Sequence, residues 1–257
     1  MTELGRVFNE VPELYDRFRP GYPPELFADL AALAGLREGS SVLDVGCGTG
    51  QATRSLVERG YAVTAVEPGA EMAALARRRL PGVPIEESTF EEWDDRGRRF
   101  DALVAASSWH WVDPAVGRRR AYEVLKPGGW MALLNHIVYR RQDEPETYAA
   151  TADLHERFTP GNPDWCPPPL EEQVRAEGVE ELGDPFGETT VRWYPAVRWF
   201  TGADLADHLR TMSPYRRLDA AVREPLLDAV AERIRTRMGD RVARRYLTVL
   251  RAARRSA

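Results

Sequence analysis

A glycine-rich loop between an aspartate and a glutamate is the strongest sign of chemistry in this sequence. In the segment VLDVGCGTG, the glycines Gly46, Gly48 and Gly50 let the backbone approach a ligand closely. Asp44 precedes them, and Glu67 follows the next apolar run, where its carboxylate can accept hydrogen bonds from two ribose hydroxyls. The GxGxG spacing differs from the GxGxxG of nicotinamide cofactors, so these residues favour a nucleoside with a positively charged arm.

A histidine between two tryptophans is the second candidate for chemistry. His110 lies in the stretch ASSWHWVDP, which directly follows the apolar run FDALVA. Residues just beyond the end of a parallel strand border the crevice in which α/β proteins bind ligands. An imidazole has a pKa suited to proton uptake near neutral pH, so His110 is the predicted catalytic residue. The alternatives are that it positions the substrate or only lines the pocket.

Short apolar runs that alternate with amphipathic segments must position these residues. In the first half of the chain, strands are predicted at 41–45, 61–66, 83–85, 100–106 and 130–136, helices at 51–60, 70–80 and 118–125, and a turn at 126–129. In the second half, strands are predicted at 189–200 and 244–254, and helices at 145–158, 201–212 and 223–238. This alternation indicates an α/β fold with a Rossmann-like, seven-stranded, mostly parallel sheet, helices on both faces and a helical lid.

The chain is predicted to form a single domain over residues 1–257 with a lid inserted into it. The proline-rich stretch TPGNPDWCPPP interrupts the strand and helix alternation and marks the insertion. The predicted parts are an N-terminal helical cap at 1–40, a nucleoside-binding half at 41–138, a lid insertion at 139–187 and the C-terminal half of the core at 188–257.

Composition excludes several classes of protein. With 43% hydrophobic and 29% charged residues and no long apolar run, the chain resembles ordinary soluble proteins, so we expect a cytoplasmic protein without membrane contact. The net charge of −5 argues against nucleic acid as a partner. Cys47 and Cys166 form neither a disulfide framework nor a metal-binding spacing, so no metal is expected. A monomer or a homodimer is expected.

Four motifs resemble those of the class I S-adenosylmethionine-dependent methyltransferases. VLDVGCGTG is similar to their first motif, VEP to the motif with the ribose-binding acid, FDALVAASS to the fourth-strand motif and LKPGGWMALL to the fifth-strand region. The segments YDRFRPGYP and WHWVD resemble the small-molecule branch of methyltransferase type 11 and trans-aconitate methyltransferase-like enzymes. The resemblance implies that S-adenosylmethionine is the cofactor, that S-adenosylhomocysteine is a product, and that a small molecule accepts the methyl group.

The resemblance also implies roles for residues at matching positions. Arg19 would grip the methionyl carboxylate with two hydrogen bonds, although an ion pair with Asp16 or Glu25 is an alternative. The implied cofactor-binding residues are Tyr15, Arg19, Asp44, Gly46, Cys47, Gly48, Gly50, Glu67, Pro68, Met72, Thr89, Phe90, Glu91, Ala106 and Ser107. The implied substrate residues are Tyr22, Trp109, Trp111, Tyr139, Thr211 and Ser213.

Several interpretations stay open at this point. The acceptor atom can be oxygen, nitrogen or carbon, and a carboxylate acceptor would need no general base. Aromatic residues near the lid, such as Trp165, favour a flat hydrophobic acceptor of specialised metabolism, whereas inward-pointing arginines such as Arg140 or Arg216 would favour a polyacid. A non-catalytic scaffold that binds the nucleoside is a further alternative. Trp193 and Trp199, which alternate with arginines, are expected to pack in the core.

Overall fold

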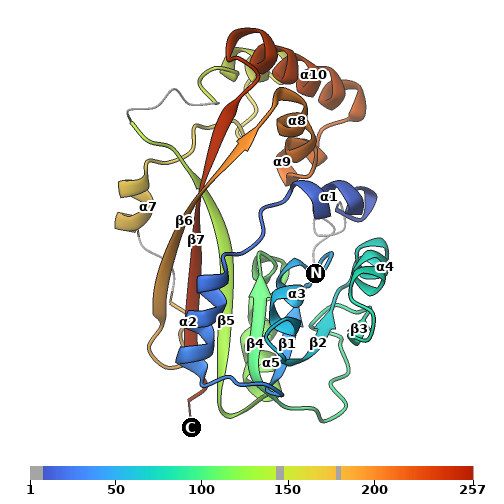
Figure 1. Ribbon diagram of the computed structural model, residues 1–257, viewed down its shortest axis with the longest axis vertical. Helices are drawn as coiled ribbons and strands as arrows, with labels where there is room; N and C mark the ends of the chain where they lie inside the picture. Colours follow the sequence, from blue (N-terminus) through green and yellow to red (C-terminus); the bar gives the residue numbers. More distant parts are fainter. Residues whose placement is uncertain (1–7, 143–147, 178–180, 257) are drawn as a thin grey trace.

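One mixed sheet organises the protein. The computed structural model describes residues 8–142, 148–177 and 181–256, and within them the strands pair in the order β3-β2-β1-β4-β5-β7-β6 (Figure 1). The parallel strands are β1 (Ser41–Val45), β2 (Ala62–Val66), β3 (Ile85–Glu86), β4 (Phe100–Ala106) and β5 (Leu125–Tyr139). The strands β6 (Thr190–Phe200) and β7 (Val242–Arg254) pair antiparallel at the far edge. The predicted seven-stranded, mostly parallel α/β fold is confirmed.

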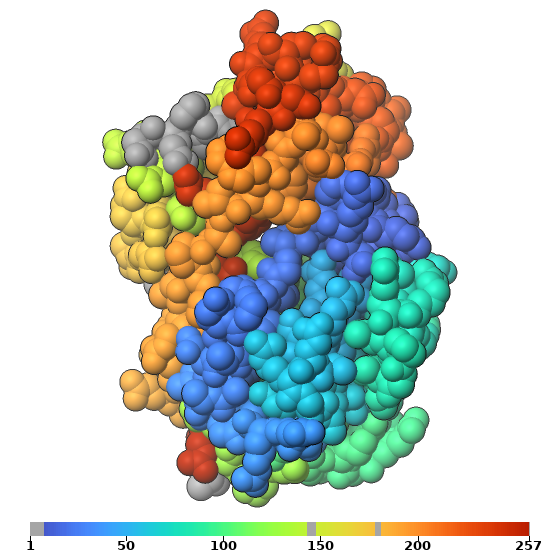
Figure 2. Space-filling view, in the orientation of Figure 1, coloured from blue at the N-terminus to red at the C-terminus, as the bar shows by residue number. Residues whose placement is uncertain are grey.

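A cap of helices stands on the extended ends of β5, β6 and β7. Its helices are α6 (Ala152–Phe158), α8 (Gly202–Arg210), α9 (Ser213–Arg216) and α10 (Ala220–Arg237), and they share one apolar cluster that is separate from the core of the sheet. Figure 2 shows the surface hollowed between this cap and the N-terminal segment. The cap therefore combines the insertion after β5 with the helices that connect β6 to β7.

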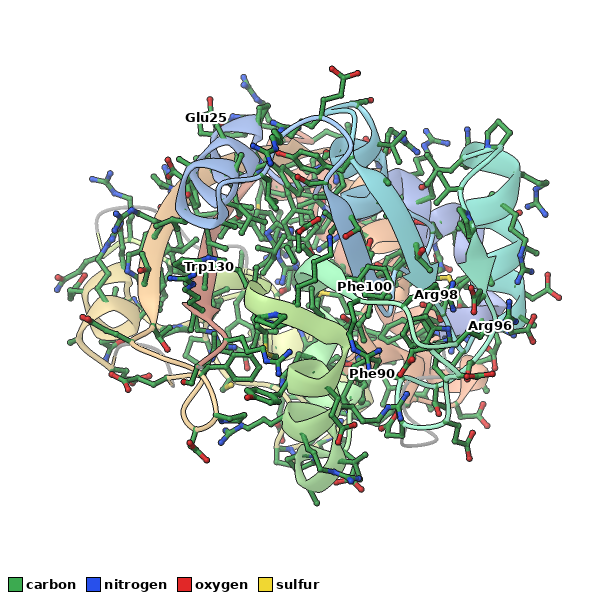
Figure 3. All side chains as sticks on the ribbon, turned by 90° about the horizontal axis from the view of Figure 1, so that it is seen from below. Glu25, Phe90, Arg96, Arg98, Phe100 and Trp130 are labelled. Carbon is green, nitrogen blue, oxygen red and sulfur yellow. The ribbon has the colours of Figure 1, made fainter. Side chains whose placement is uncertain are left out.

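Helices cover both faces of the parallel strands. Buried residues of α5 (Pro114–Val124) pack on one face, and those of α2 (Pro24–Ala34) and α3 (Gln51–Val57) pack on the other. Figure 3 shows α2, which carries the labelled Glu25, and α5 on opposite sides of the sheet. Because both faces are covered, β1 has the nearly continuous apolar sequence SVLDV rather than an alternating one.

Three further helices complete the described chain. The helix α1 (Pro12–Phe18) lies between the cap and α4 (Ala70–Arg79), while α7 (Glu171–Glu177) packs Val174 beside Tyr139 and Leu247 at the ends of β5 and β7. His208 Nδ1 of α8 donates a hydrogen bond to the Phe18 carbonyl over 3.0 Å, which ties the cap to the N-terminal segment. No helix in the described part of the chain is long and apolar enough to span a bilayer.

Local expectations differ from the structure at three places. The predicted turn at 126–129 belongs to β5, where a bulge separates the pair Phe100 and Leu125 from the pair Ala102 and Trp130. The predicted helix at 145–158 is α6, which begins at Ala152, and residues 145–147 lie outside the described part. Trp199 was expected in the core but is 55% exposed, because β6 is an edge strand, and Arg241 stacks on its ring.

Candidate functional site

A cavity of about 240 Å³ opens at the carboxyl ends of the parallel strands, where the strand order reverses beside β1. The N-terminal segment and the 3-10 helix η2 (Trp109–Trp111) supply its rim. The predicted site residues that the structure brings together on its wall are Tyr15, Arg19, Tyr22, Gly46, Cys47, Gly48, Glu67, Pro68, Met72, Phe90, Glu91, Ala106, Ser107, His110, Trp111 and Ser213.

Three of the predicted cofactor residues lie behind this wall. Asp44 is fully buried beneath the glycine loop, where one carboxylate oxygen accepts a hydrogen bond from Thr53 over 2.6 Å and the other has no partner. Gly50 precedes α3 and packs towards Leu80. The Thr89 hydroxyl bonds to Glu92 over 3.3 Å, away from the cavity lining.

Three of the predicted substrate residues also lie elsewhere. Trp109 packs against the core cluster of the sheet, with its ring 6.0 Å from that of Phe90. Tyr139 is 5% exposed and lines a second cavity inside the cap. The Thr211 hydroxyl donates to the His208 carbonyl over 2.6 Å, and the Thr211 carbonyl accepts a hydrogen bond from Arg19 over 2.8 Å.

The glycine loop has a backbone that few other residues adopt. Gly46, Gly48 and Gly50 have φ values of 68°, 58° and 89°. A Cβ on Gly46 would lie 2.5 Å from the Ser108 Cβ, so the loop and the residue after β4 approach each other too closely for a side chain. The Gly46 and Cys47 amides both donate to the Val66 carbonyl, which anchors the loop to the end of β2.

Glu67 is held against this loop at the end of β2. It is 8% exposed, and its two carboxylate oxygens accept hydrogen bonds from the Gly48 and Gly69 amides, each over 2.8 Å. A carboxylate offers about four acceptor positions, so both oxygens can accept further donors from the cavity. Burial raises the pKa of Glu67 to about 7 despite the two amide bonds, and burial raises the pKa of Asp44 to about 6.

Arg19 brings a positive charge to the same cavity without an acidic partner. The expected alternative, an ion pair with Asp16 or Glu25, is not formed, because Asp16 pairs with Arg79 and the Arg19 guanidinium donates to the Thr211 carbonyl. Its Nε is buried and has no hydrogen-bond partner, and the guanidinium lies 5.0 Å from the centre of the Tyr15 ring. Because Arg19 has no acidic partner among the described residues and its Nε is unpaired, its guanidinium can pair with a carboxylate ligand in the cavity.

The two histidines on the wall differ in how firmly they are held. His110 lies at the rim, where one side of the residue is open to solvent and its ring lies 4.5 Å from that of Trp111. Partial desolvation of the ring, together with the charge of Arg19, lowers the pKa of His110. The half-buried His136 stacks on Tyr22 with 4.5 Å between ring centres, and its Nδ1 bonds to the Thr248 hydroxyl over 2.9 Å. Burial lowers the pKa of His136 to about 4, so this ring is neutral at neutral pH.

The amino-acid sequence of the chain is similar to those of known proteins. A family model described as a methyltransferase domain matches residues 42–129. Over 142 residues the chain is 41% identical to an uncharacterized methyltransferase of Mycobacterium tuberculosis, and this match covers 55% of each protein. It is 27% identical to the trans-aconitate 2-methyltransferase of Deinococcus radiodurans, with 93% of this chain and 95% of that protein covered. In the first of these matches the chain spans about half the length of its curated relative.

The relationship extends to three-dimensional structure. A protein assigned as a type II methyltransferase from Anaeromyxobacter dehalogenans superposes with a TM-score of 0.68 at 27% identity, covering 93% of this chain and 99% of that one. The chain is thus similar to methyltransferases in both sequence and fold. Within the described residues, no group of three or more histidine, cysteine or acidic side chains is arranged to hold a metal ion.

Several residues in and beside the cavity have no counterpart among the residues predicted from the sequence. Phe8 on the cavity wall stacks edge-on against Tyr15 and Trp111. Its neighbour Asn9 accepts hydrogen bonds from the Glu71 and Met72 amides in the first turn of α4. Ser108 donates to the Val45 carbonyl and His136 faces Tyr22. His136 ends a predicted strand, which was a usable signal, whereas Phe8 reaches the site only because the N-terminal segment folds back over it. The other lining residues not predicted are Pro20, Val45, Thr49, Gln51, Ala52, Val66, Ser88, Val112 and Asn135.

Proposed function

We propose that this protein binds S-adenosylmethionine in the cavity beside the glycine loop and transfers its methyl group to a small-molecule acceptor. The observation that carries this proposal is the buried carboxylate of Glu67, held by the Gly48 and Gly69 amides, on a wall that also presents the guanidinium of Arg19, which has no acidic partner among the described residues. A nucleoside with an amino-acid arm has the hydroxyls and the carboxylate that these two groups bind.

The proposed binding roles follow from these positions. Glu67 accepts the ribose hydroxyls, and Arg19 pairs with the methionyl carboxylate. Apolar contacts for the adenine come from Pro68 and from the buried side chains of Met72 and Phe90. The other residues proposed to contact the cofactor on the wall are Tyr15, Gly46, Cys47, Gly48, Glu91, Ala106 and Ser107. Asp44, Gly50 and Thr89 are proposed to support this wall from behind.

Methyl transfer asks mainly for alignment and for the exclusion of water. When bound, the cofactor supplies a methyl group already activated by the positive sulfur, so the chain needs to align the acceptor with it. The aromatic rings of Phe8, Tyr15 and Trp111 cover the rim of the cavity in edge-on contacts. The Tyr22 hydroxyl and the Ser107 hydroxyl, 3.0 Å apart, and His136 offer polar contacts to an acceptor.

The test of the proposal has two parts, binding and transfer. Calorimetry with S-adenosylhomocysteine should show binding to the wild-type protein. Incubation with methyl-labelled S-adenosylmethionine and a metabolite extract should move the label into a small molecule. An absence of calorimetric binding would refute the cofactor assignment. Binding without any transfer would instead favour a non-catalytic scaffold.

We expect the affinity for S-adenosylmethionine to fall about tenfold between pH 8 and pH 6. A cationic ligand favours ionised carboxylates, and Glu67, with a pKa of about 7, is largely protonated at pH 6. S-adenosylhomocysteine carries the same ribose hydroxyls, so its affinity should fall to a similar extent. Calorimetry across this range measures both, and a Glu67→Gln variant should show a flatter curve. An affinity that does not change with pH for either ligand would contradict the assignment of Glu67 to the ribose.

The same pKa shifts affect the ligand-free fold in a defined direction. Glu67 and Asp44 have folded-state pKa values above their ordinary values of 4.5 and 3.8, so the folded state binds more protons than the unfolded state between those limits. Their contribution to the free energy of unfolding is therefore full below pH about 4 and is lost as the pH rises through about 7.

His110 is the proposed proton acceptor when the methyl acceptor must lose a proton. We expect His110→Gln and His110→Ala to slow label transfer by about a hundredfold or more while the affinity for S-adenosylhomocysteine stays unchanged. His136→Asn, which retains a polar atom near Nδ1, tests the separate role of orienting the acceptor through Nε2 and should raise KM. Unchanged transfer rates in both His110 variants would show that this histidine only lines the pocket.

The finer properties of the protein are also part of this proposal. Both cysteines, Cys47 and Cys166, are free, which suits a reducing compartment such as the cytoplasm. The acceptor is a small molecule rather than a nucleic acid, in keeping with the net charge of −5. We propose a monomer or a homodimer. Sedimentation of the purified protein measures its state directly.

A further inference from the structure

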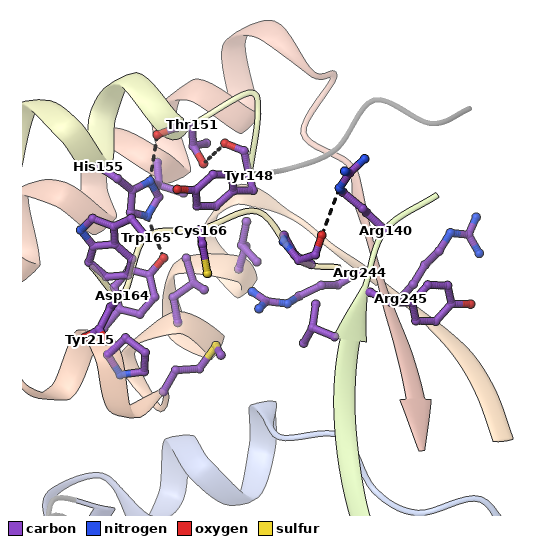
Figure 4. A pocket seen from close by; sticks show the side chains of 18 of the residues that line it. Arg140, Tyr148, Thr151, His155, Asp164, Trp165, Cys166, Tyr215, Arg244 and Arg245 are labelled. Atoms are coloured by element: carbon purple, nitrogen blue, oxygen red, sulfur yellow. Dashed lines mark hydrogen bonds between the residues drawn. The ribbon is translucent and has the colours of Figure 1, made fainter. Parts of the chain in front are cut away.

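A second cavity, of about 220 Å³, lies inside the cap (Figure 4). It is lined by α6, α8, α9, the segment 164–168 and the cap ends of β5 and β7, and we call it the cap cavity. Val138 of β5 lines it. His136, two residues earlier on the same strand, lines the cavity beside the glycine loop, which we call the cofactor cavity. Residues two apart on a strand share a face and are separated by about 7 Å, so the two cavities are neighbours.

The start of α9 separates the two cavities. Ser213 lines the cofactor cavity, whereas Met212, Pro214 and Tyr215 line the cap cavity. A molecule that reached from one cavity into the other would pass this short helix. The cap cavity is thus placed to receive the part of an acceptor that lies away from the reacting atom.

One wall of the cap cavity is aromatic and has its polar atoms already paired. His155 Nδ1 donates to the Thr151 carbonyl over 2.8 Å, so the neutral ring accepts the Tyr215 hydroxyl at Nε2 over 2.7 Å. The Trp165 Nε1 donates to the Thr159 hydroxyl, and its ring lies 4.9 Å from that of Tyr215. Because these groups satisfy one another, the wall offers a ligand ring surface rather than free donors.

Apolar side chains from the cap helices cover another part of the cavity. Leu205 and Leu209 of α8, Met212 before α9 and Val230 of α10 all line it. Together with the aromatic wall they form a surface for a flat or otherwise apolar body.

Arg244 introduces a positive charge into this apolar surrounding. In Figure 4 its side chain extends from β7 into the cavity towards the side where Trp165 and Tyr215 lie. Its Nε is buried without a hydrogen-bond partner, and no ion pair is formed by it among the described residues. Arg244 is half-buried, its Nε is shielded from water, and its guanidinium is therefore available to pair with an anion in the cavity.

The other charged groups of the cavity do not neutralise Arg244. Asp164 forms an ion pair with Arg217, and Arg140 donates through Nε to the Pro168 carbonyl over 3.0 Å. Arg216, the other arginine considered from the sequence, pairs with Glu10 and does not line the cavity.

The charge of Arg244 shifts the pKa values of two neutral neighbours, Tyr215 and His208. Burial raises the pKa of Tyr215 while Arg244 opposes that rise, and burial together with Arg244 lowers the pKa of His208. Neither side chain carries a negative charge at neutral pH. Within the part of the chain that the structure describes, the groups on which this guanidinium acts thus leave its charge uncompensated.

We propose that the cap cavity binds the non-reacting part of the methyl acceptor, a flat apolar body with one anionic group, and that Arg244 pairs with this group. The proposal rests on the proposed function, because it treats the ligand of the cap cavity as the acceptor. It combines the two acceptor classes that the sequence left open: the aromatic wall selects the body, and one arginine selects the acid.

Binding of 2-naphthoate, without cofactor, tests this proposal. We expect wild-type protein to bind this carboxylate at least tenfold more tightly than the neutral 2-naphthamide, as measured by calorimetry, because a charge-assisted bond is lost with the amide. The Arg244→Gln variant should remove this difference. Arg237→Gln, which changes an exposed arginine at the end of α10, is the matched control and should bind as the wild type does.

The outcomes separate this inference from the cofactor assignment. Naphthoate bound equally well by Arg244→Gln, no preference for the carboxylate, or no binding of either probe to the wild type would each overturn the inference. The Arg244→Gln variant should still bind S-adenosylhomocysteine with wild-type affinity, which also verifies its folding. If the wild type binds naphthoate through Arg244 but does not bind S-adenosylhomocysteine, the cap cavity is a binding site and the proposed function is wrong.

Discussion

Replacing Glu67 by alanine is expected to weaken the binding of S-adenosylhomocysteine by a hundredfold or more. Glu67 is 8% exposed, and its carboxylate is oriented by the Gly48 and Gly69 amides. This carboxylate can accept hydrogen bonds from two ribose hydroxyls. Hydrogen bonds to a charged group contribute about 1.5–3 kcal/mol each, so losing two of them costs about 3–6 kcal/mol. Isothermal calorimetry at pH 8, where the carboxylate is ionised, measures the loss.

A neighbouring acid provides the control for this experiment. Glu71 lies in the first turn of α4, is exposed, and does not line the cavity. The Glu71→Ala variant removes the same charge from nearly the same place and should change the affinity less than twofold. If Glu67→Ala binds S-adenosylhomocysteine within threefold of the wild type, the ribose assignment is wrong, provided that circular dichroism shows both variants to be folded.

Replacing Gly46 by alanine is expected to destabilise the protein by about 3 kcal/mol and to abolish cofactor binding. The new Cβ would lie 2.5 Å from the Ser108 Cβ, and Ser108 is held by its bond to the Val45 carbonyl. Strain at a φ of 68° adds about 1 kcal/mol to the cost of overpacking, which is about 1–3 kcal/mol. Thermal unfolding should show a Tm lower by about 10 °C.

A second glycine separates backbone strain from the steric clash. Gly39 also has a positive φ, of 81°, but a Cβ there would meet no atom within 4 Å. The Gly39→Ala variant should therefore lose only about 1 kcal/mol and keep its affinity for S-adenosylhomocysteine. Similar losses of stability in both variants would show that the approach of the loop to Ser108 is not what requires glycine at position 46.

The sequence could predict the positions of the glycine loop and of the acid beside it because local constraints determine them. Gly46, Gly48 and Gly50 follow a strand directly, so their conformation and their place at its carboxyl end depend on adjacent residues. Glu67 follows the neighbouring parallel strand, and parallel strands bring their ends to one edge. The prediction of Trp199 in the core failed because alternation along a strand cannot show which strand is the edge.

The lining of the cap cavity depended on contacts between segments that are distant in the sequence. Tyr139 and Arg244 enter the cap cavity because the antiparallel pairing of β5 with β7 brings their ends together beneath helices from two separate parts of the chain. His136 was placed on a predicted strand, but its contacts with Tyr22 and Thr248 come from opposite ends of the chain.

The sequence by itself thus determined the sheet, the glycine loop and the acid beside it, because each follows from neighbouring residues and from the parallel arrangement of strands. Only the tertiary structure decided which side chains line the two cavities. That outcome depends on how the cap packs on the ends of β5 and β7. The half-buried Arg244, whose Nε has no partner among the described residues, has no signal in its neighbouring residues.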